Sequence, residues 1–460
     1  MFRIHLSRDK SKSVTSVPAM TRCHRTCFDV GRALKRPAPS KVTRMQGTSL
    51  RRLLAQSTVA EVVVVLGAAA ALSIVSRTRT PVEFGLYAVT LRTVGLFQAP
   101  LLVGLGVSLP RILPVTSDER ERSQSITAAV TIVATIGLTL ALCSVLMGDL
   151  LVRTIFGSSA GKPELWALVL LLSGSLIHGV AYASSRGRLN FRTANIVLAV
   201  NLGLIPLASA LITRGVVPLI ACTGTGWLLV SLGSLRGQLV RPRALRQRVR
   251  MLISMGWRRV PGEFALFGLT AVPPLLVLHQ TGVVEAGRVS LAMSVLTLAG
   301  TASAPFSAVI LPHVSAWHGT AEQHRIGTLV RRVVLVVALT VPLTLIAQLA
   351  ASFVVPFVFG PEARNAVPAV QLVLCAVPAY TTYVLLRSLI DGSTDRATTM
   401  NLACVAFAVF VVVAAGLEQV IGSDTTAVLL AAVFALWVLA ILMLGVVRRL
   451  VMDMKVQIST

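Results

Sequence analysis

Runs of about 20 apolar residues dominate the chain from residue 53 onward. A helix rises 1.5 Å per residue, so about 20 residues cross the ~30 Å hydrocarbon core of a bilayer. Backbone polar groups find no water partner there, and such runs must therefore be helical. The pattern predicts twelve transmembrane helices, at residues 55–76, 84–109, 126–147, 164–184, 193–213, 217–235, 260–279, 288–311, 333–356, 366–386, 398–417 and 426–447.

Residues 1–52 break this pattern. They carry 13 Lys and Arg, two acidic residues and no apolar run long enough to span. A cleavable signal peptide needs an apolar core of about 7–15 residues near its start, and this segment has none. It is predicted to be a basic, disordered, cytoplasmic tail. The alternative is that translation begins at Met20 or Met45.

Positive charge is distributed unevenly between the two sides of the predicted spans. With the N-terminus inside, 35 of the 43 Lys and Arg residues fall on the cytoplasmic side, and seven fall outside. Lys and Arg accumulate in cytoplasmic loops of membrane proteins. Both termini are therefore predicted to face the cytoplasm, and the protein is predicted to lie in the cell membrane. Arg92 is the remaining cation and lies within a span.

The two halves of the chain resemble each other at an offset of about 202–206 residues, which predicts two six-helix repeats. The predicted organisation is tail 1–52, first repeat 53–235, linker 236–259, second repeat 260–447 and cytoplasmic C-terminus 448–460. Repeats with six spans each share one orientation, and a substrate path would run between them. The matches are Glu83, Gly85 and Ala88 with Glu285, Gly287 and Ser290, Pro100 with Pro305, Phe156-Gly157 with Phe359-Gly360, and Arg192 and Asn195 with Arg396 and Asn401.

Composition excludes several classes of protein. Hydrophobic residues make up 55% of the chain and charged residues 13%, whereas soluble domains carry about a quarter charged residues. A soluble enzyme and a disulfide scaffold are excluded. The motif Cys23-His24-x-x-Cys27 has the look of a metal clip, but zinc needs four ligands and the tail offers only His5 besides. No metal, cofactor or catalytic residue is predicted, and no Gly-x-x-x-x-Gly-Lys loop for ATP is present.

The sequence EFGLYA at 83–88, after a first span and a short outside loop, resembles the signature of bacterial polysaccharide-biosynthesis membrane proteins. VEAG at 284–287 and Leu311-Pro312 are also similar. These proteins are oligosaccharide-lipid flippases of the multidrug/oligosaccharidyl-lipid/polysaccharide (MOP) exporter superfamily. The resemblance covers roughly residues 48–447. It implies an all-α polytopic membrane protein with a central cavity. It also implies transport of a polyprenyl-diphosphate-linked oligosaccharide to the outer leaflet, for capsule, O-antigen or exopolysaccharide synthesis.

Arg92 is the strongest candidate for a substrate-binding residue. Ionisable groups inside spans are costly and usually functional, and a guanidinium suits a phosphate. The alternative is a structural pair with Glu61, the carboxylate within the first span. Glu61 and Glu263 occupy equivalent places in the two repeats and are candidates for binding a coupling H⁺ or Na⁺. Glu263 also fits a first-turn carboxylate stabilised by the helix dipole.

Other polar residues have both a functional and a structural interpretation. Arg259, with Arg258, begins the seventh span, where it would meet a diphosphate at the inner leaflet or anchor the helix. Arg288 would serve substrate exit or anchor the outer end of the eighth span. His178 is expected to be a hydrogen-bonded packing residue.

The linker 236–259 has apolar residues at helical spacing with arginines between them, namely Leu245, Val249, Leu252 and Ile253. The pattern is typical of an amphipathic helix on the inner leaflet, attracted to anionic lipids, or of a linker whose charge only fixes topology. Nucleic acid is not a predicted partner.

Three other functions remain as alternatives. A multidrug antiporter of the same superfamily would need more membrane carboxylates. A membrane glycosyltransferase or polymerase would need acidic residues on a sizeable outside loop, and the longest loop after the tail is the linker 236–259. A major-facilitator carrier would carry a Gly- and Asp-bearing basic loop that 111–123 lacks. A transporter without enzymatic activity is the preferred interpretation.

Overall fold

The computed structural model describes residues 48–157, 160–241, 245–301, 303, 314, 324–393, 398–422 and 425–459. The chain divides into the units Met1–Arg52 and Leu53–Thr460, and the fold below belongs to the second unit. Helices form throughout the described part, which contains no strand. The expected all-α fold class is therefore confirmed. The predicted disorder of residues 1–47 and the Cys23–Cys27 motif lie outside the described residues, and helix begins at Thr48.

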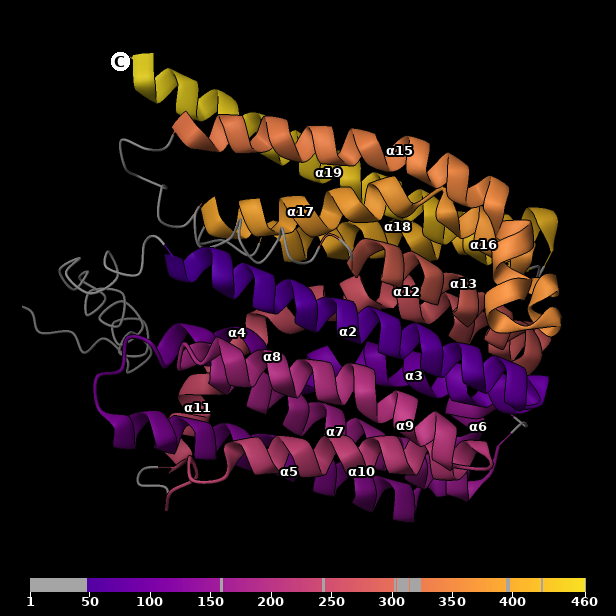
Figure 1. Cartoon of the computed structure of the whole chain (residues 1–460), viewed down its shortest axis with the longest axis horizontal. Coiled ribbons are helices and arrows are strands. Elements are labelled where there is room, and N and C mark those ends of the chain that lie inside the picture. Colours follow the sequence, from indigo (N-terminus) through magenta and orange to yellow (C-terminus); the bar gives the residue numbers. More distant parts are fainter. Residues whose placement is uncertain are drawn as a thin grey trace, which may run out of the picture. The chain divides into compact units, whose positions relative to one another are not determined.

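The first half of the unit contains helices α2 to α10 (Figure 1). Among them, α2, α5, α7 and α10 are each long and apolar enough to cross a membrane, and α8, η3 and α9 form one further span together. The short helix α6 was not predicted by the apolar pattern. The bounds are α2 Thr48–Thr78, α3 Pro81–Leu101, α4 Leu105–Ile112, α5 Glu119–Leu146, α6 Gly148–Phe156, α7 Lys162–Gly187, α8 Phe191–Ala199, the π-helical turn η3 Val200–Leu204, α9 Ile205–Ile212 and α10 Val216–Leu235.

The second half begins with the linker helix and ends near the C-terminus. A 3₁₀ turn joins the linker helix to the next span without a break. The bounds are α11 Leu245–Gly256, η4 Trp257–Arg259, α12 Val260–Thr281, α13 Val283–Thr301, α15 His324–Phe359, η6 Pro361–Ala366, α16 Val367–Leu374, α17 Val377–Ser393, α18 Thr398–Ile421 and α19 Thr425–Ser459.

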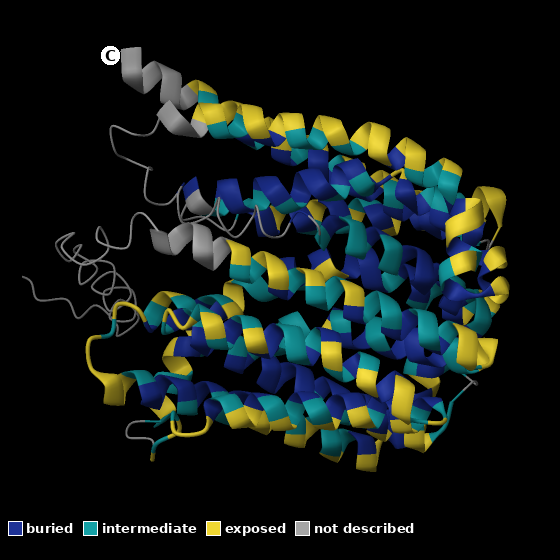
Figure 2. Ribbon diagram, in the orientation of Figure 1, coloured by how far each residue is buried: buried dark blue, intermediate teal, exposed yellow. Residues whose placement is uncertain are grey.

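The number of spans agrees with the apolar pattern. Within the described residues, ten helices are long and apolar enough to cross a membrane, and the number rises to twelve if each of two bent helix pairs is one span. Burial separates central from peripheral helices, as Figure 2 shows. In α7, 72% of the most apolar 18-residue window is buried, against 11% in α15. The exposed apolar side chains of α15 form a face suited to lipid.

Two predicted spans are broken rather than continuous. The span predicted at 84–109 bends by 46° between α3 and α4, and the one at 366–386 bends by 52° between α16 and α17. At the first break Val103 has φ +48° and Gly104 φ +71°. A β-branched residue at positive φ is a genuine outlier, and such strain persists only where surrounding structure holds it.

Glycines allow the central helices to approach closely. α3 packs against both α12 and α13. A Cβ at Gly85 would overlap the Val283 carbonyl, and one at Gly287 would lie 2.9 Å from the Gly85 Cα. Small residues let helix backbones meet in this way in membrane proteins. The contact joins a helix of the first half to one of the second.

The linker helix α11 packs on protein with its apolar face, which differs from the expected placement of that face in the leaflet. Leu252 is fully buried in a cluster with residues of α4, α5 and α7, and Leu245, Val249 and Ile253 pack against the same cluster. The physical reason is a close fit at its end, because a Cβ on Gly256 would overlap the Val103 carbonyl oxygen. The face left exposed carries Arg246, Arg250, Met251, Met255 and Trp257.

Candidate functional site

Arg92 lies in the interior of α3, about 17 Å along the helix axis from Pro81 at 1.5 Å per residue. Its Nε donates to Ser290 Oγ at 2.9 Å, and its Nη2 donates to the Ser290 carbonyl at 2.7 Å and to Ser294 Oγ at 2.5 Å. Both serines belong to α13 and stand four residues apart, so they share one helical face. Arg92 thus joins the two halves of the fold.

Arg92 forms no ion pair with any described residue. The cation that acts electrostatically on Glu61 is Arg186 at the end of α7. The hypothetical pair between Arg92 and Glu61 is therefore not the arrangement in the described part of the chain. The Arg92 guanidinium is held by neutral oxygens and keeps its positive charge uncompensated.

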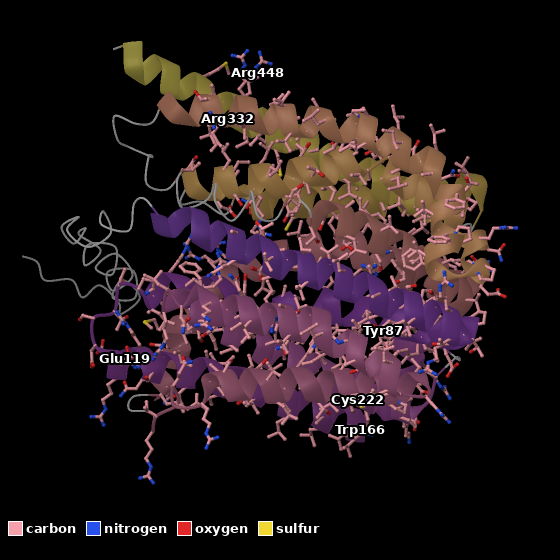
Figure 3. All side chains as sticks on the ribbon, in the orientation of Figure 1. Tyr87, Glu119, Trp166, Cys222, Arg332 and Arg448 are labelled. Carbon is pink, nitrogen blue, oxygen red and sulfur yellow. The ribbon has the colours of Figure 1, made fainter. Side chains whose placement is uncertain are left out.

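A cavity of about 270 Å³ surrounds the Arg92 side chain, and we call it the Arg92 cavity. Helices from both halves line it, and Figure 3 labels one of its residues, Tyr87. Arg92 is its one charged lining residue, among apolar, aromatic and hydroxyl side chains. The lining is Val64, Ala68, Ala71, Leu72, Tyr87, Leu91, Arg92, Leu202, Pro206, Thr223, Trp227, Ser294, Thr297 and Leu298.

A second cavity, of about 320 Å³, lies between α12 and α17, and we call it the Tyr383 cavity. Its lining residues are Leu266, Phe267, Thr270, Tyr380, Tyr383, Val384, Arg387 and Ser388. Tyr380 lines this cavity, and its ring also packs against Gly300 of α13, the helix whose serines bond Arg92.

Arg387 is a candidate site residue that sequence reasoning missed. The span predicted at 366–386 ends just before it, but α17 continues to Ser393. Arg387 Nη1 donates to Tyr383 Oη at 2.8 Å, and Arg387 Nε lies 3.6 Å from Asp391 Oδ2. Tyr383, Arg387 and Asp391 recur every four residues, which places them on one helical face. That spacing was the available signal.

Glu263 and Arg259 lie close to this group. Glu263 lies in the first turn of α12 and is 8% exposed. Arg387 and Arg259 are the cations that interact electrostatically with its carboxylate. Arg259 is the last residue of the turn η4, and its positive charge is also repelled by that of Arg111 in α4. Two predicted site residues are thus brought together with Arg387 and Asp391, while Arg92 and Glu61 are not.

Arg288 lies apart from both cavities. It pairs with Glu285 one turn earlier and lines a small pocket of about 50 Å³ with Arg79 and Glu362. This pocket lies at the end of the bundle that carries α6 and the α12–α13 turn, which we call the α6 end. We call the opposite end, with α4 and α11, the α11 end (Figure 1).

Contacts between the halves are strong at the α6 end. The α2 hydroxyls Ser73 and Ser76 donate to the Val358 and Phe359 carbonyls at 2.5 and 2.8 Å. Arg77 adds bonds to the Phe357 and Val358 carbonyls. These bonds fasten the end of α2 to the end of α15.

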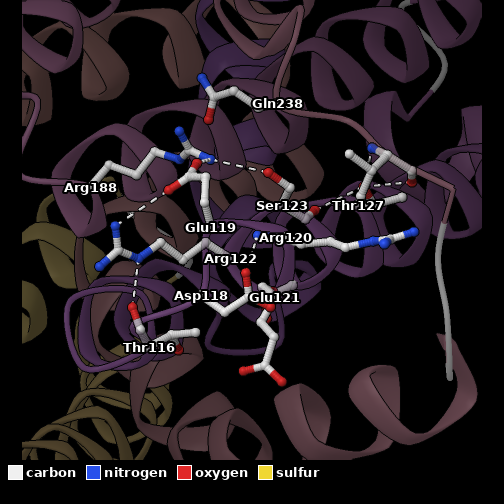
Figure 4. Close-up of polar contacts among 12 residues, drawn as sticks. Thr116, Asp118, Glu119, Arg120, Glu121, Arg122, Ser123, Thr127, Arg188 and Gln238 are labelled. Carbon is white, nitrogen blue, oxygen red and sulfur yellow. Dashed lines mark hydrogen bonds and ion pairs between the residues drawn. The ribbon is translucent and has the colours of Figure 1, made fainter.

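At the α11 end, ion pairs instead join elements of the first half and the linker, and Figure 4 shows those around Glu119. Glu119 pairs with Arg188 and, at 3.4 Å, with Arg122. Arg248 of α11 lies 3.6 Å from a Glu121 oxygen. Figure 3 shows Arg332 and Arg448 toward this same end. The pairs tie α5, α7 and α11 into one body.

His178 has the expected packing environment. It is 4% exposed, and its Nδ1 lies 2.9 Å from Asn201 Nδ2, which also donates to Ser231 Oγ at 2.9 Å. Asn201 lies in the π-helical turn η3. Among the described residues, no group of three or more His, Cys, Asp or Glu side chains could hold a metal ion.

Residues 74–368 match the model of a protein family described as polysaccharide biosynthesis protein. This match agrees with the resemblance carried by residues 83–88. No curated protein matches the sequence.

Solved structures of transporters share the fold. The lipid II flippase MurJ in an inward closed conformation aligns with a TM-score of 0.64 at 12% identity, over 86% of this chain and 87% of that chain. A multidrug resistance MATE family transporter of the MOP superfamily, in an outward-facing conformation, aligns with a TM-score of 0.61 at 12% identity, over 91% and 99%. A MATE crystal structure in the straight conformation gives 0.63 at 14%, over 88% and 96%. At these identities the likeness concerns the fold.

Proposed function

The chain belongs to the polysaccharide biosynthesis protein family, and from that premise we propose that it transports a polyprenyl-diphosphate-linked oligosaccharide. The substrate moves from the cytoplasmic to the outer leaflet of the cell membrane by alternating access between two six-helix repeats. The fold shared with MurJ and MATE transporters supports transport rather than catalysis. The product is used for capsule, O-antigen or exopolysaccharide synthesis.

The observation that carries the proposal is an uncompensated guanidinium in a cavity between the two halves. Three Arg92 N–H groups are used by Ser290 and Ser294, and no described residue bonds the two N–H groups of Nη1. A diphosphate accepts charge-assisted hydrogen bonds from such a group, and a low-dielectric site strengthens them. A cationic drug would instead be repelled, which disfavours the antiporter alternative.

The proposal also assigns roles to the other charged residues. The termini face the cytoplasm, so the α11 end is the inner end and the arginine-bearing face of α11 meets anionic lipids. Arg259 receives the diphosphate at the inner side, and Arg288 assists its exit at the outer side. Glu61 and Glu263 bind the coupling H⁺ or Na⁺.

The test is glycan export by cells that carry Arg92→Ala. The variant should insert and accumulate normally but lose surface polysaccharide, because the diphosphate loses its cation. Arg214→Ala is the matched control, since Arg214 is an exposed arginine outside both cavities and should keep full export. Full export by Arg92→Ala would contradict the assignment of Arg92.

Deletion of the gene separates the two transport functions. Loss of the flippase should trap lipid-linked glycan on the cytoplasmic leaflet and remove surface polysaccharide. Unchanged surface polysaccharide together with new drug sensitivity would favour the antiporter.

A further inference from the structure

The two cavities differ in charge, and this difference suggests which part of a substrate headgroup each cavity binds. We propose that the Tyr383 cavity binds the uncharged sugar ring nearest the diphosphate, while the diphosphate itself lies at Arg92. The inference rests on the proposed function and names the sugar as the part of the substrate that the second half of the chain selects.

Charge balance separates the Tyr383 cavity from the Arg92 cavity. Arg387 is the one charged residue in its lining, and Asp391 compensates it at 3.6 Å. Glu263 adds a second buried carboxylate that acts on Arg387, and Arg259 adds a second cation near Glu263. Arg111 of α4 interacts electrostatically with Arg259 and with no other member of this group. Two carboxylates, Asp391 and Glu263, thus offset the two cations Arg387 and Arg259. This group therefore offers a dianionic diphosphate less attraction than Arg92, which pairs with no described carboxylate.

The other lining groups suit a neutral sugar. Tyr380 and Tyr383 place their rings 5.9 Å apart at 43°, and Phe267 contributes a third aromatic ring to the cavity. A sugar ring packs its C–H face on aromatic rings and directs hydroxyls to polar neighbours. Tyr383 Oη accepts a bond from Arg387, so its own O–H is directed elsewhere and can donate to a sugar oxygen.

Tyr380 lies at the junction that such a headgroup would cross. Its ring packs directly against Gly300 of α13, the helix that holds Arg92 through Ser290 and Ser294. A diphosphate at Arg92 therefore has its first sugar beside Tyr380, on the side of the Tyr383 cavity.

Binding measurements on the full-length protein in lipid nanodiscs test this division. The probes are polyprenyl diphosphate without sugar and polyprenyl diphosphates that carry a single hexose, N-acetylhexosamine or deoxyhexose. The wild type should prefer at least one sugar-bearing probe over the bare diphosphate. Tyr383→Phe should lower affinity for the preferred probe by about tenfold, the value of roughly one hydrogen bond, and leave the bare probe unchanged.

Two controls make the outcome specific. Tyr182→Phe removes the same hydroxyl from a tyrosine of α7 outside both cavities and should change neither affinity. Arg92→Ala should weaken both kinds of probe alike. Thr270→Val is a second variant of the cavity lining and should repeat the selective loss.

Three results would overturn the inference. A wild type that binds all probes equally has no sugar site, and an equal loss on both probes in Tyr383→Phe would place the diphosphate at Arg387. A wild type that binds no probe would contradict the proposed function itself, and the sugar site with it.

Discussion

Arg92 and His178 are both polar side chains inside membrane helices, but their surroundings differ. His178 and Ser231 share hydrogen bonds with the Asn201 amide nitrogen and line neither cavity, whereas Arg92 borders a cavity and has N–H groups that no described residue uses. Hydrogen bonds between buried polar groups help to specify a fold. A cation that faces a cavity can also bind a ligand. The contrast agrees with a structural role for His178 and with the proposed role of Arg92 in transport.

Replacement of Asn201 by leucine should destabilise the protein. Asn201→Leu leaves the His178 ring and the Ser231 hydroxyl without their shared partner, and each unsatisfied buried group costs about 1–3 kcal/mol. The free energy of unfolding in detergent measures the loss. Asn195→Leu is the control, because Asn195 is partly buried and, among the described residues, its side chain bonds Ser57 alone, at 3.3 and 3.5 Å. Equal losses in the two variants would contradict the network.

At this scale the sequence singled out Arg92 as a candidate site residue and did not single out Arg387. Arg92 was recognisable because a cation inside an apolar run has no topological explanation. Arg387 follows an apolar run directly, where an arginine usually anchors a helix end. Only the folded chain shows that α17 continues past it and that Tyr383 and Asp391 surround it. Contacts between distant elements, such as Arg92 with Ser290, are likewise invisible in the sequence.

Among the elements, the break between α3 and α4 is the point where local sequence and tertiary packing meet. Pro100 removes a backbone donor near the helix end, which favours a kink. The location of the bend at Val103 and Gly104 depends on α11, whose Gly256 packs against these two residues. Apolar periodicity therefore predicted a span of the right length but not its bend.

Gly256→Ala should weaken the attachment of α11. The added methyl group would overlap the Val103 carbonyl, and overpacking of this kind costs about 1–3 kcal/mol. A lower thermal unfolding midpoint should follow. Gly106→Ala is the matched control in α4, because a Cβ there meets nothing within 4 Å and alanine favours a helix. If Gly256→Ala were as stable as Gly106→Ala, the bend would not depend on α11.

In the unit Leu53–Thr460, the two halves meet along α3 and α13 and at the α6 end. Gly85 packs on Gly287, and Ser290 Oγ lies 3.4 Å from the Ala88 carbonyl. Each pair combines positions that correspond at the 202-residue offset. Equivalent residues that touch lie on a twofold axis, which supports two repeats around a pseudo-twofold. Phe156-Gly157 and Phe359-Gly360 also both end a helix with a glycine at positive φ.

Alternating access requires the bonds at the α6 end to break in each cycle. A cysteine pair at Ser76 and Phe359 would join α2 to the end of α15, where Ser76 Oγ now donates to the Phe359 carbonyl. Oxidation should stop transport, and a reducing agent should restore it. Each single cysteine variant should be insensitive to oxidant. Undiminished transport by the fully cross-linked protein would contradict alternating access through this end.

The most direct measurement is movement of lipid-linked glycan in vesicles that contain the purified protein. Enzymatic modification from outside reports how much polyprenyl-diphosphate oligosaccharide reaches the outer leaflet. Wild-type vesicles should expose substrate much faster than protein-free vesicles, and Arg214→Ala should match the wild type. Arg92→Ala vesicles should behave like protein-free vesicles. Wild-type movement no faster than the protein-free background, or full movement by Arg92→Ala, would contradict transport through the Arg92 cavity.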